Sequence, residues 1–265
     1  MLRVPSRHNS RLQAVMNAVN ADEELSQLYR CANVNAVDRG GMNDHGEVHI
    51  QIVANAALRL MRLLLEAGVT PNVVTNYGLD NLDAELIVVL SACLHDIGIA
   101  IHRHDHERHS LILAYPKARQ LLAPHYTEPT LTIITSEVLH CISAHRSDVG
   151  CLTIEAGVVK VADALDMTEG RSRIPFEAGQ VNIHSVSAMA VKAVSIEKGE
   201  ARPVRIDVLL NSTAGVFQVD ELLRRKLQNS TLAPLVEVVA RLEDTPAGTE
   251  TAEPPGPGFV QIYRL

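Results

Sequence analysis

Two residues at the end of a long apolar segment carry the strongest chemical signal in the sequence. His95 and Asp96 directly follow residues 85–94, which are mostly apolar and contain no turn signal. Such a segment is too short to span a bilayer and too uniformly apolar for a surface helix, so it predicts a buried core helix. Burying an imidazole beside a carboxylate is costly without compensation. Either a divalent cation bound by both side chains or a structural hydrogen bond between them would supply that compensation.

Other residues able to bind a metal lie at comparable places in the sequence. Ten of the twelve histidines fall within residues 45–145, which is not an even scatter. His45 and His49 are four residues apart and share one face of a predicted helix. Asp163 interrupts another predicted helix that is otherwise apolar. We therefore expect a metal shell of two nitrogens and two oxygens inside a helical bundle. It would consist of one histidine of the first helix, His95, Asp96 and Asp163.

A second metal position is predicted from three further histidines, His106, His140 and His145. The last two lie near the end of a predicted helix over residues 130–145. Five residues correspond to about 140° of helix rotation, so both can face one cavity only if it wraps around the helix end. The sequence alone does not choose between them.

The elements expected to position these residues are helical up to about residue 170. Apolar periodicity, capping residues and glycines predict the following helices: one or two over 10–31, then 45–67 capped by Asp44, a central helix capped by Asp83, 106–114 ending before Pro116, 130–145 and 155–167. We therefore predict an all-α domain over residues 1–177.

The period changes from helical to alternating near Gly179. Strands are expected over 191–197, 204–210 and 235–242, with a possible edge strand at 259–263 and an amphipathic helix at 218–228. The Pro/Gly/Thr-rich segment 245–258 is predicted to be mobile. Residues 178–265 thus predict a small α+β domain, and its paired strands favour a homo-oligomer formed through this part.

Composition narrows the class of protein. The chain has 265 residues, a net charge of −7 and 3% aromatic residues, which argues against a general nucleic-acid binder. The four cysteines show no CxxC spacing and are expected to be reduced. We see neither a signal peptide nor a segment of transmembrane length, so we predict a cytoplasmic protein without membrane contact.

Five segments in the same order resemble the HD-domain metal-dependent phosphohydrolases. They are NDHGEVH (43–49), LHDIG (94–98), HERHSLILA (106–114), HCISAHR (140–146) and VADALD (161–166), and together they span about residues 40–170. The resemblance implies an HD-type helical bundle. It places His106 as the family histidine that follows the His-Asp pair. It also favours His49 over His45, because Val53 and Ala54 follow His49 at the expected spacing; His45 would then lie near the site or be an alternative ligand.

The resemblance also implies a reaction. A divalent metal would activate a water molecule for attack on phosphorus, and Asp96 or Asp163 would orient or deprotonate that water. One or two ions of Mn, Fe, Co, Ni, Zn or Mg would be compatible with such a shell. The nearest cations in the sequence for the substrate phosphate are Arg146, Arg171 and Arg173. The expected substrate is a nucleotide or another small phosphorylated compound.

Three alternatives stay open at the level of the sequence. The bundle could keep its metal and sense a nucleotide without turnover. It could hold two irons and oxidise a small molecule. It could also be a purely structural bundle with histidine hydrogen bonds, although that leaves many ionisable residues at ligand-like places unexplained. Related cyclic-dinucleotide diesterases carry a lysine directly after the HDIG segment and a Gly-Tyr-Pro motif further on. Here Ile99 replaces the lysine and the Gly-Tyr-Pro motif is absent, which argues against that activity.

Overall fold

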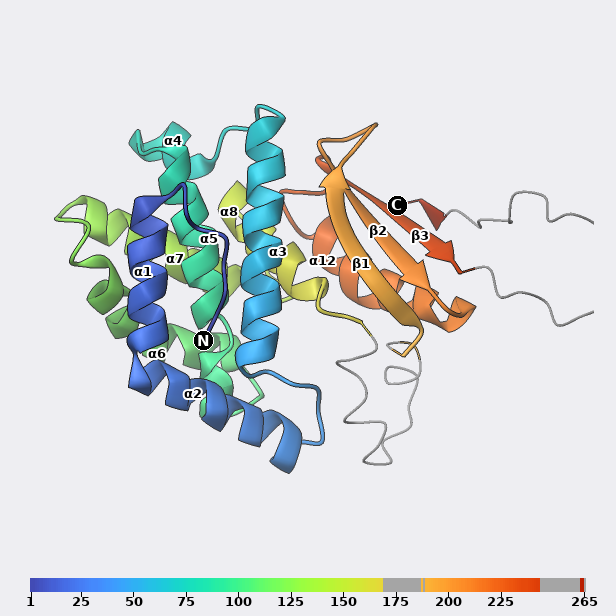
Figure 1. Cartoon of the computed structure of the whole chain (residues 1–265), viewed down its shortest axis with the longest axis horizontal. Coiled ribbons are helices and arrows are strands. Elements are labelled where there is room, and N and C mark those ends of the chain that lie inside the picture. The colour runs from blue at the N-terminus through green and yellow to red at the C-terminus, as the bar shows by residue number, and fades with distance from the viewer. Residues whose placement is uncertain (169–186, 188, 244–262, 265) are drawn as a thin grey trace, which may run out of the picture.

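The chain folds as a helical bundle followed by a small mixed sheet (Figure 1). The computed structural model describes residues 1–168, 187, 189–243 and 263–264. The bundle contains α1 (Ser10–Ala21), α2 (Glu23–Asn33), η1 (Val34–Arg39), α3 (Glu47–Glu66), α4 (Asn72–Tyr77), α5 (Asn81–Leu94), η2 (Ile97–Ala100), α6 (His106–Leu122), α7 (Thr130–Ala144) and α8 (Ile154–Ala164). The C-terminal part contains β1 (Val191–Lys198), β2 (Val204–Leu210), η3 (Thr213–Gly215), α11 (Val216–Gln218), η4 (Val219–Arg224), α12 (Arg225–Gln228), β3 (Val236–Leu242) and β4 (Tyr263–Arg264). The predicted fold class is confirmed.

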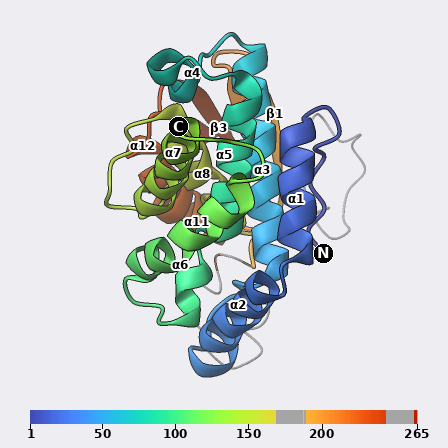
Figure 2. The same ribbon diagram turned by 90° about the vertical axis from the view of Figure 1, so that its left-hand side faces the viewer.

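Helix α5 is the buried centre of the bundle, packed against α3, α7 and α8 (Figures 1 and 2). Every residue from Asp83 to Leu94 is buried, as its unbroken apolar sequence predicts. The predicted N-cap was wrong: Asp80 caps the helix, and Asp83 returns the hydrogen bond as the third helical residue of a capping box. The C-terminal end of α5 delivers His95 and Asp96 into the interior of the bundle.

Helix α3 begins two residues later than predicted, at Glu47, with Gly46 as its N-cap. Asp44 does not cap the helix in the predicted way, but its Oδ1 accepts the backbone N–H of Gly46 at 3.1 Å and that of His49 at 3.4 Å. The first turn of α3, which carries His49, is therefore held by the preceding loop.

By length and composition, α3 could cross a membrane, so the expectation that no segment reaches that length was wrong. However, 61% of its apolar window is buried inside the protein. The core helix of a soluble protein passes the same test, because it too is apolar over most of its surface. The packing of α3 against α5, α8 and β1 accounts for its apolar composition.

Helix α6 continues through Pro116 to Leu122, although a helix end was predicted before this proline. Proline in a helix interior removes one backbone hydrogen bond and disfavours the helix. Here Ala114 precedes the proline, Ala118 and Leu122 follow it, and all three are fully buried. Tertiary packing on both sides of Pro116 therefore outweighs its local cost.

The start of α6 approaches η2 very closely at Gly98. A Cβ atom at this position would lie 2.2 Å from both the carbonyl oxygen of His106 and the backbone nitrogen of Ser110. The Gly98 N–H also donates to Ser110 Oγ at 2.8 Å. The absence of a side chain at Gly98 thus lets the first turn of α6 sit directly beside Asp96.

The sheet has the order β1-β2-β3-β4. Strands β1 and β2 are antiparallel, and β2 pairs in parallel with β3, with Val204 opposite Val236. The parallel pair is joined by the helical turns η3, α11, η4 and α12, as a parallel connection requires. The three predicted strands up to residue 242 are confirmed, and the predicted helix at 218–228 is found as this series of short helical segments. The predicted mobile segment 245–258 lies outside the described residues, as does most of the predicted edge strand.

The C-terminal part packs onto the bundle through α8 and α3 (Figure 1). A Cβ atom at Gly157 of α8 would lie 2.3 Å from Thr231 Oγ1, and that hydroxyl donates to the carbonyl of Thr153 at 2.8 Å. Buried residues of the helices and of β1–β3 form one continuous core. The predicted boundary at residues 177 and 178 lies outside the described residues, so the division into two domains stays a prediction.

Candidate metal centre

Four predicted ligands from three helices converge on one point, which we call position A. Its donors are His49 Nε2 from α3, His95 Nε2 and Asp96 Oδ2 from the end of α5, and Asp163 Oδ1 from α8. His49 Nε2 lies 3.2 Å from His95 Nε2, 3.3 Å from Asp96 Oδ2 and 3.4 Å from Asp163 Oδ1. His95 Nε2 lies 3.5 Å from the Asp96 oxygen and 3.6 Å from the Asp163 oxygen. Donors about 2.1 Å from one ion are separated by roughly 3.0–3.4 Å, so this spacing fits a metal site.

A second set of donors, position B, uses the other oxygen of Asp96. His106 Nε2 lies 3.0 Å from Asp96 Oδ1, and His145 Nε2 lies 3.7 Å from the same oxygen. The two imidazole nitrogens are 3.3 Å apart. Asp96 therefore presents one carboxylate oxygen to each position, which is the arrangement of a carboxylate that bridges two ions.

The outer nitrogens of three histidines fix the direction of the inner ones. His95 Nδ1 donates to the carbonyl of Ala92 at 2.9 Å, and His145 Nδ1 donates to the carbonyl of Ile142 at 2.6 Å. His49 Nδ1 lies 2.6 Å from Asp166 Oδ2. Because these oxygens can only accept, Nδ1 carries the proton and the Nε2 lone pair points into the centre. Neutral imidazole and carboxylate oriented in this way form a donor set that fits a divalent first-row metal.

His106 differs, because its Nδ1 has competing partners. The carbonyl of Arg103 lies at 3.2 Å and Glu107 Oε2 at 3.3 Å, and both accept a proton from Nδ1. The Arg103 guanidinium nitrogen Nη1 lies at 2.7 Å and can only donate to Nδ1. The first arrangement points the Nε2 lone pair at position B, whereas the second places a proton between Nε2 and Asp96 Oδ1.

The electrostatics of the centre favour two carboxylates beside a charged imidazole. Burial alone would lower the pKa of His95, but Asp96 and Asp163 outweigh it and raise the pKa to about 9. Burial would raise the pKa of Asp96 and Asp163, yet His95 holds the first well below its usual range, and Lys226 together with His95 does the same for the second. Burial and the neighbouring His95 lower the pKa of His145 well below its usual value. A cation at position A would replace the proton of His95 as the partner of both carboxylates.

His45 lies next to the centre, as the resemblance predicted for the less favoured histidine of the first helix. Its Nδ1 is 2.8 Å from Asp96 Oδ2. The distances from His45, His49 and Asp96 also satisfy the spacing of a metal site, so its alternative assignment as a ligand stays open. In the arrangement described above, its hydrogen bond orients the bridging carboxylate.

The structure separates His140 from His145. His140 Nε2 accepts the backbone N–H of Leu152 at 3.2 Å, and this histidine belongs to none of the metal-compatible groups among the described residues. His145 lies at the C-terminal end of α7 with its side chain buried in the centre. Position B is therefore built with His145.

The predicted phosphate cations are only partly described. Arg146 pairs through Nη1 with Asp105 at 2.9 Å and through Nε with Asp148 at 2.6 Å. Its guanidinium is thus engaged by two carboxylates near the protein surface. Arg171 and Arg173 lie outside the described residues.

Three residues beside the centre were not singled out from the sequence: Glu107, Asp166 and Lys226. Glu107 lies at metal-compatible spacing from His106 and His145. Asp166 is three residues after Asp163, which places both on one face of the helix predicted over 155–167, and that spacing was the signal that could have identified it. In the structure α8 ends at Ala164, and Asp166 follows it. Lys226 donates from Nζ to Asp163 Oδ2. Nothing in its local sequence indicates this contact, because its partner lies 63 residues away and depends on how the C-terminal part docks.

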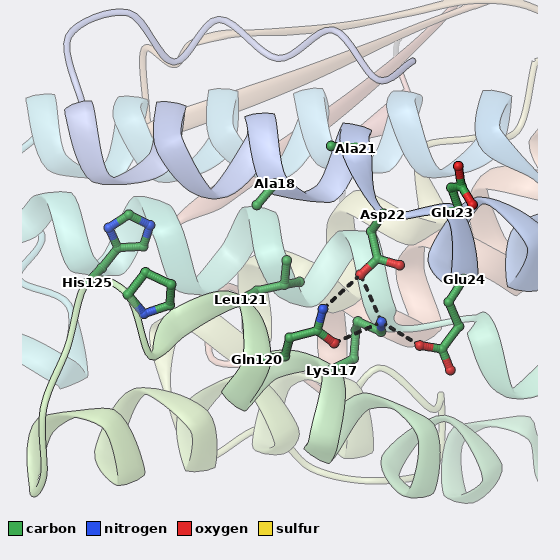
Figure 3. A pocket seen from close by; sticks show the side chains of 10 residues that line it. Ala18, Ala21, Asp22, Glu23, Glu24, Lys117, Gln120, Leu121 and His125 are labelled. Carbon is green, nitrogen blue, oxygen red and sulfur yellow. Dashed lines mark hydrogen bonds and ion pairs between the residues drawn. The ribbon is translucent and has the colours of Figure 1, made fainter.

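A surface pocket of about 500 Å³ lies between α1, α2 and α6 (Figure 3). None of the predicted site residues lines it. Its Lys117 donates to Asp22 Oδ2 at 2.8 Å, Glu24 Oε2 at 2.7 Å and Gln120 Oε1 at 3.0 Å. All three protons of the ammonium are thereby used within the pocket, so we place no site there.

Comparisons with known proteins agree with this geometry. The family model described as HD domain matches residues 40–168. An uncharacterized protein of Methanocaldococcus jannaschii, MJ1020, is 40% identical over 222 residues, which cover 84% of this chain and 86% of that protein. The chain belongs to the HD-domain family. No solved structure matches it significantly. All the residues of positions A and B lie within the matched HD domain, whereas Lys226 lies beyond it.

Proposed function

We propose that this HD-domain protein is a metal-dependent phosphohydrolase that acts on a nucleotide or another small phosphorylated compound. The observation that supports this proposal most directly is the sharing of Asp96 between two neighbouring donor sets. Two adjacent cations held by a common carboxylate can bind both the attacking and the leaving oxygen of a phosphoryl transfer.

In this proposal each residue of the metal centre has a specific role. His49, His95, Asp96 and Asp163 would hold one divalent ion, and His106, His145 and the second oxygen of Asp96 the other. Bound ions of this kind lower the pKa of a coordinated water and polarise phosphoryl oxygens. Asp163, whose side chain is 15% exposed against 3% for Asp96, lies nearer to solvent and would be the carboxylate that orients the attacking water. His45 holds the Asp96 carboxylate through Nδ1.

The proposed setting follows from composition and from the cysteines. All four cysteines are free thiols, which supports a cytoplasmic location. The net charge of −7 argues against a general nucleic-acid partner, so we propose that local cations and the bound metal hold the anionic ligand. A homo-oligomer formed through the C-terminal part remains a proposal, which light scattering of the full-length protein tests: a monomeric mass at all concentrations would contradict it.

The decisive experiment combines metal analysis with a phosphoester panel. Protein purified without added metal would be compared with Asp96→Ala, and with His140→Ala as a matched control. His140 is a half-buried histidine of the same bundle that contacts neither position. We expect one to two metal equivalents and hydrolysis in the wild type and in the control, and neither in Asp96→Ala.

The other outcomes favour different functions. Metal retained by the wild type without hydrolysis of any phosphoester would contradict the proposal and favour a nucleotide sensor or, if the metal is iron, a di-iron oxygenase. No metal in any of the proteins, even after reconstitution, would identify the cluster as a structural histidine–carboxylate network.

A further inference from the structure

The C-terminal part of the chain places one cation at the metal centre. Lys226 lies on α12, which packs against α8. Its Nζ donates to Asp163 Oδ2, while Asp163 Oδ1 faces position A, 3.4 Å from His49 Nε2. The ammonium group is therefore separated from position A by a single carboxylate.

This side of position A is also its more accessible side among the described residues. The side chains of His49 and His95 are fully buried, and that of Asp96 is 3% exposed. By contrast, the side chains of Asp163 and Lys226 are 15% and 16% exposed. An anion that approaches the centre from solvent would therefore meet Lys226 together with Asp163.

Contacts between α8 and the residues around α12 hold the backbone of Lys226 in place. Lys160, a fully buried lysine of α8, donates from Nζ to the carbonyls of Val149 and Asn229, and Asn229 directly follows α12. Gly157 allows the close approach of Thr231 described above. These contacts fix the distance between α12 and α8, and with it the reach of Lys226 to the centre.

We propose that Lys226 binds the phosphoryl group of the substrate, so that the C-terminal part completes the active site of the HD domain. This inference rests on the proposed function. An ammonium group has three protons to donate, and within residues 1–168 and 189–243 the Nζ of Lys226 donates to Asp163 only. Two protons therefore remain for phosphoryl oxygens, for which a nearby cation is a favourable partner. Arg146, in contrast, is paired with two carboxylates, those of Asp105 and Asp148, which together outweigh its single positive charge.

The test measures binding of inorganic phosphate to the full-length, Mn²⁺-loaded protein by titration calorimetry. Lys226→Met removes the charge, Lys226→Arg keeps it, and Arg225→Met is the matched control. Arg225 is the preceding residue on α12, but it is exposed and pairs with Glu221. We expect Lys226→Met to weaken phosphate binding about tenfold to a hundredfold, with the Mn²⁺ content unchanged. Arg225→Met should bind like the wild type, and Lys226→Arg should retain most of the affinity.

Every other outcome either supports the inference or overturns it. Wild-type phosphate affinity in Lys226→Met at full Mn²⁺ content would overturn the inference and leave the proposed function intact. If Lys226→Met loses Mn²⁺ or unfolds, Lys226→Arg decides: retained phosphate binding supports the role of the charge, and lost binding at full Mn²⁺ content overturns it. If the wild type takes up no Mn²⁺, the titration is repeated with Fe²⁺, Co²⁺, Ni²⁺, Zn²⁺ and Mg²⁺; uptake of none of these ions would overturn the proposed function, and this role of Lys226 with it.

Discussion

The two halves of the metal centre share Asp96 but are built differently. Position A has four donors, one from α3, two from the residues that directly follow α5 and one from α8, three helices that pack against one another. Position B combines Asp96 with His106, at the start of α6, and His145, at the end of α7; Glu107 also lies at metal-compatible spacing from these two histidines. In position A, the Nδ1 atoms of both histidines are held by an acceptor, whereas in position B the Arg103 guanidinium competes for Nδ1 of His106.

This difference indicates an order of occupancy. A site with more ligands that are already oriented loses less entropy on binding a metal, so we expect position A to fill first and more tightly. Position B depends on which tautomer His106 adopts and would bind the more exchangeable ion. The four predictions below test this comparison, from the largest expected effect to the smallest.

Asp96→Asn should remove both metals, because Asp96 is the residue common to both positions. The amide keeps the shape of the side chain but loses the negative charge, and only its oxygen can still bind a cation. We expect hydrolysis to fall about a thousandfold or more, since the bound ions would supply most of the transition-state stabilisation. Elemental analysis and a phosphoester assay measure both effects; a variant that keeps one full equivalent would show that one position binds its metal without the Asp96 carboxylate, against this prediction.

Removing one histidine from each half should have unequal effects. His49→Ala removes a ligand of position A, and we expect it to lower metal content to less than one equivalent and to abolish activity. His145→Ala removes a ligand of position B, and we expect it to retain about one tightly bound equivalent, with activity lowered to a lesser degree. Metal titration with a chromogenic chelator distinguishes the two. Equal losses in both variants would contradict the proposed order of occupancy.

The two halves also differ in the direction of their histidine pKa shifts, which predicts the pH dependence of the metal-free protein. The pKa of His95 is raised from 6.5 to about 9, so its stabilising contribution is complete below pH 6.5 and is lost as the pH rises through about 9. The pKa of His145 is lowered, so its contribution is present above pH 6.5 and is lost as the pH falls below that value. We therefore expect the chelator-treated protein to unfold at the highest temperature near pH 6.5.

We call the loss of stability above pH 6.5 the alkaline limb and the loss below it the acidic limb. Both are limited in size, and variants separate them. The alkaline limb contributes at most on the order of 3 kcal/mol to the free energy of unfolding. Asp96 and Asp163, whose pKa values are lowered, act on a separate limb below about pH 4. His95→Gln should flatten the alkaline limb and His145→Gln the limb just below pH 6.5, as measured by the thermal midpoint across pH. An alkaline limb that survives in His95→Gln would assign it to another group.

Much of position A was predictable because its ligands conflict with their local sequence. His95, Asp96 and Asp163 are polar residues in apolar helical segments, and such residues are costly to bury without a partner. Their convergence then follows from the packing of amphipathic helices. The choice of His145 over His140 could not be predicted, because it depends on how the end of α7 turns relative to α5 and α6.

Features that depend on tertiary contacts could not be predicted from the sequence. Pro116 carries a strong local signal to end a helix, but the buried residues around it outweigh that signal. Asp80 and Asp83 are equivalent as potential caps until the start of α5 is known. Lys226 is one of several basic residues on an amphipathic segment, and only the docking of α12 on α8 separates it from Arg225.

The smallest predicted effect concerns His106, whose competing partners distinguish position B from position A. Arg103 Nη1 can only donate to His106 Nδ1, so it favours the tautomer in which Nε2 carries a proton and cannot bind a metal. Arg103→Ala removes this competitor and also a positive charge near position B. We therefore expect the metal affinity of position B to rise severalfold, on the order of the roughly 1 kcal/mol of one hydrogen bond, while that of position A stays the same. Arg108→Ala, which removes an exposed arginine of α6, is the control. Stepwise Mn²⁺ titration measures both affinities, and a weaker position B in Arg103→Ala would mean that Arg103 orients His106 for the metal rather than competing with it.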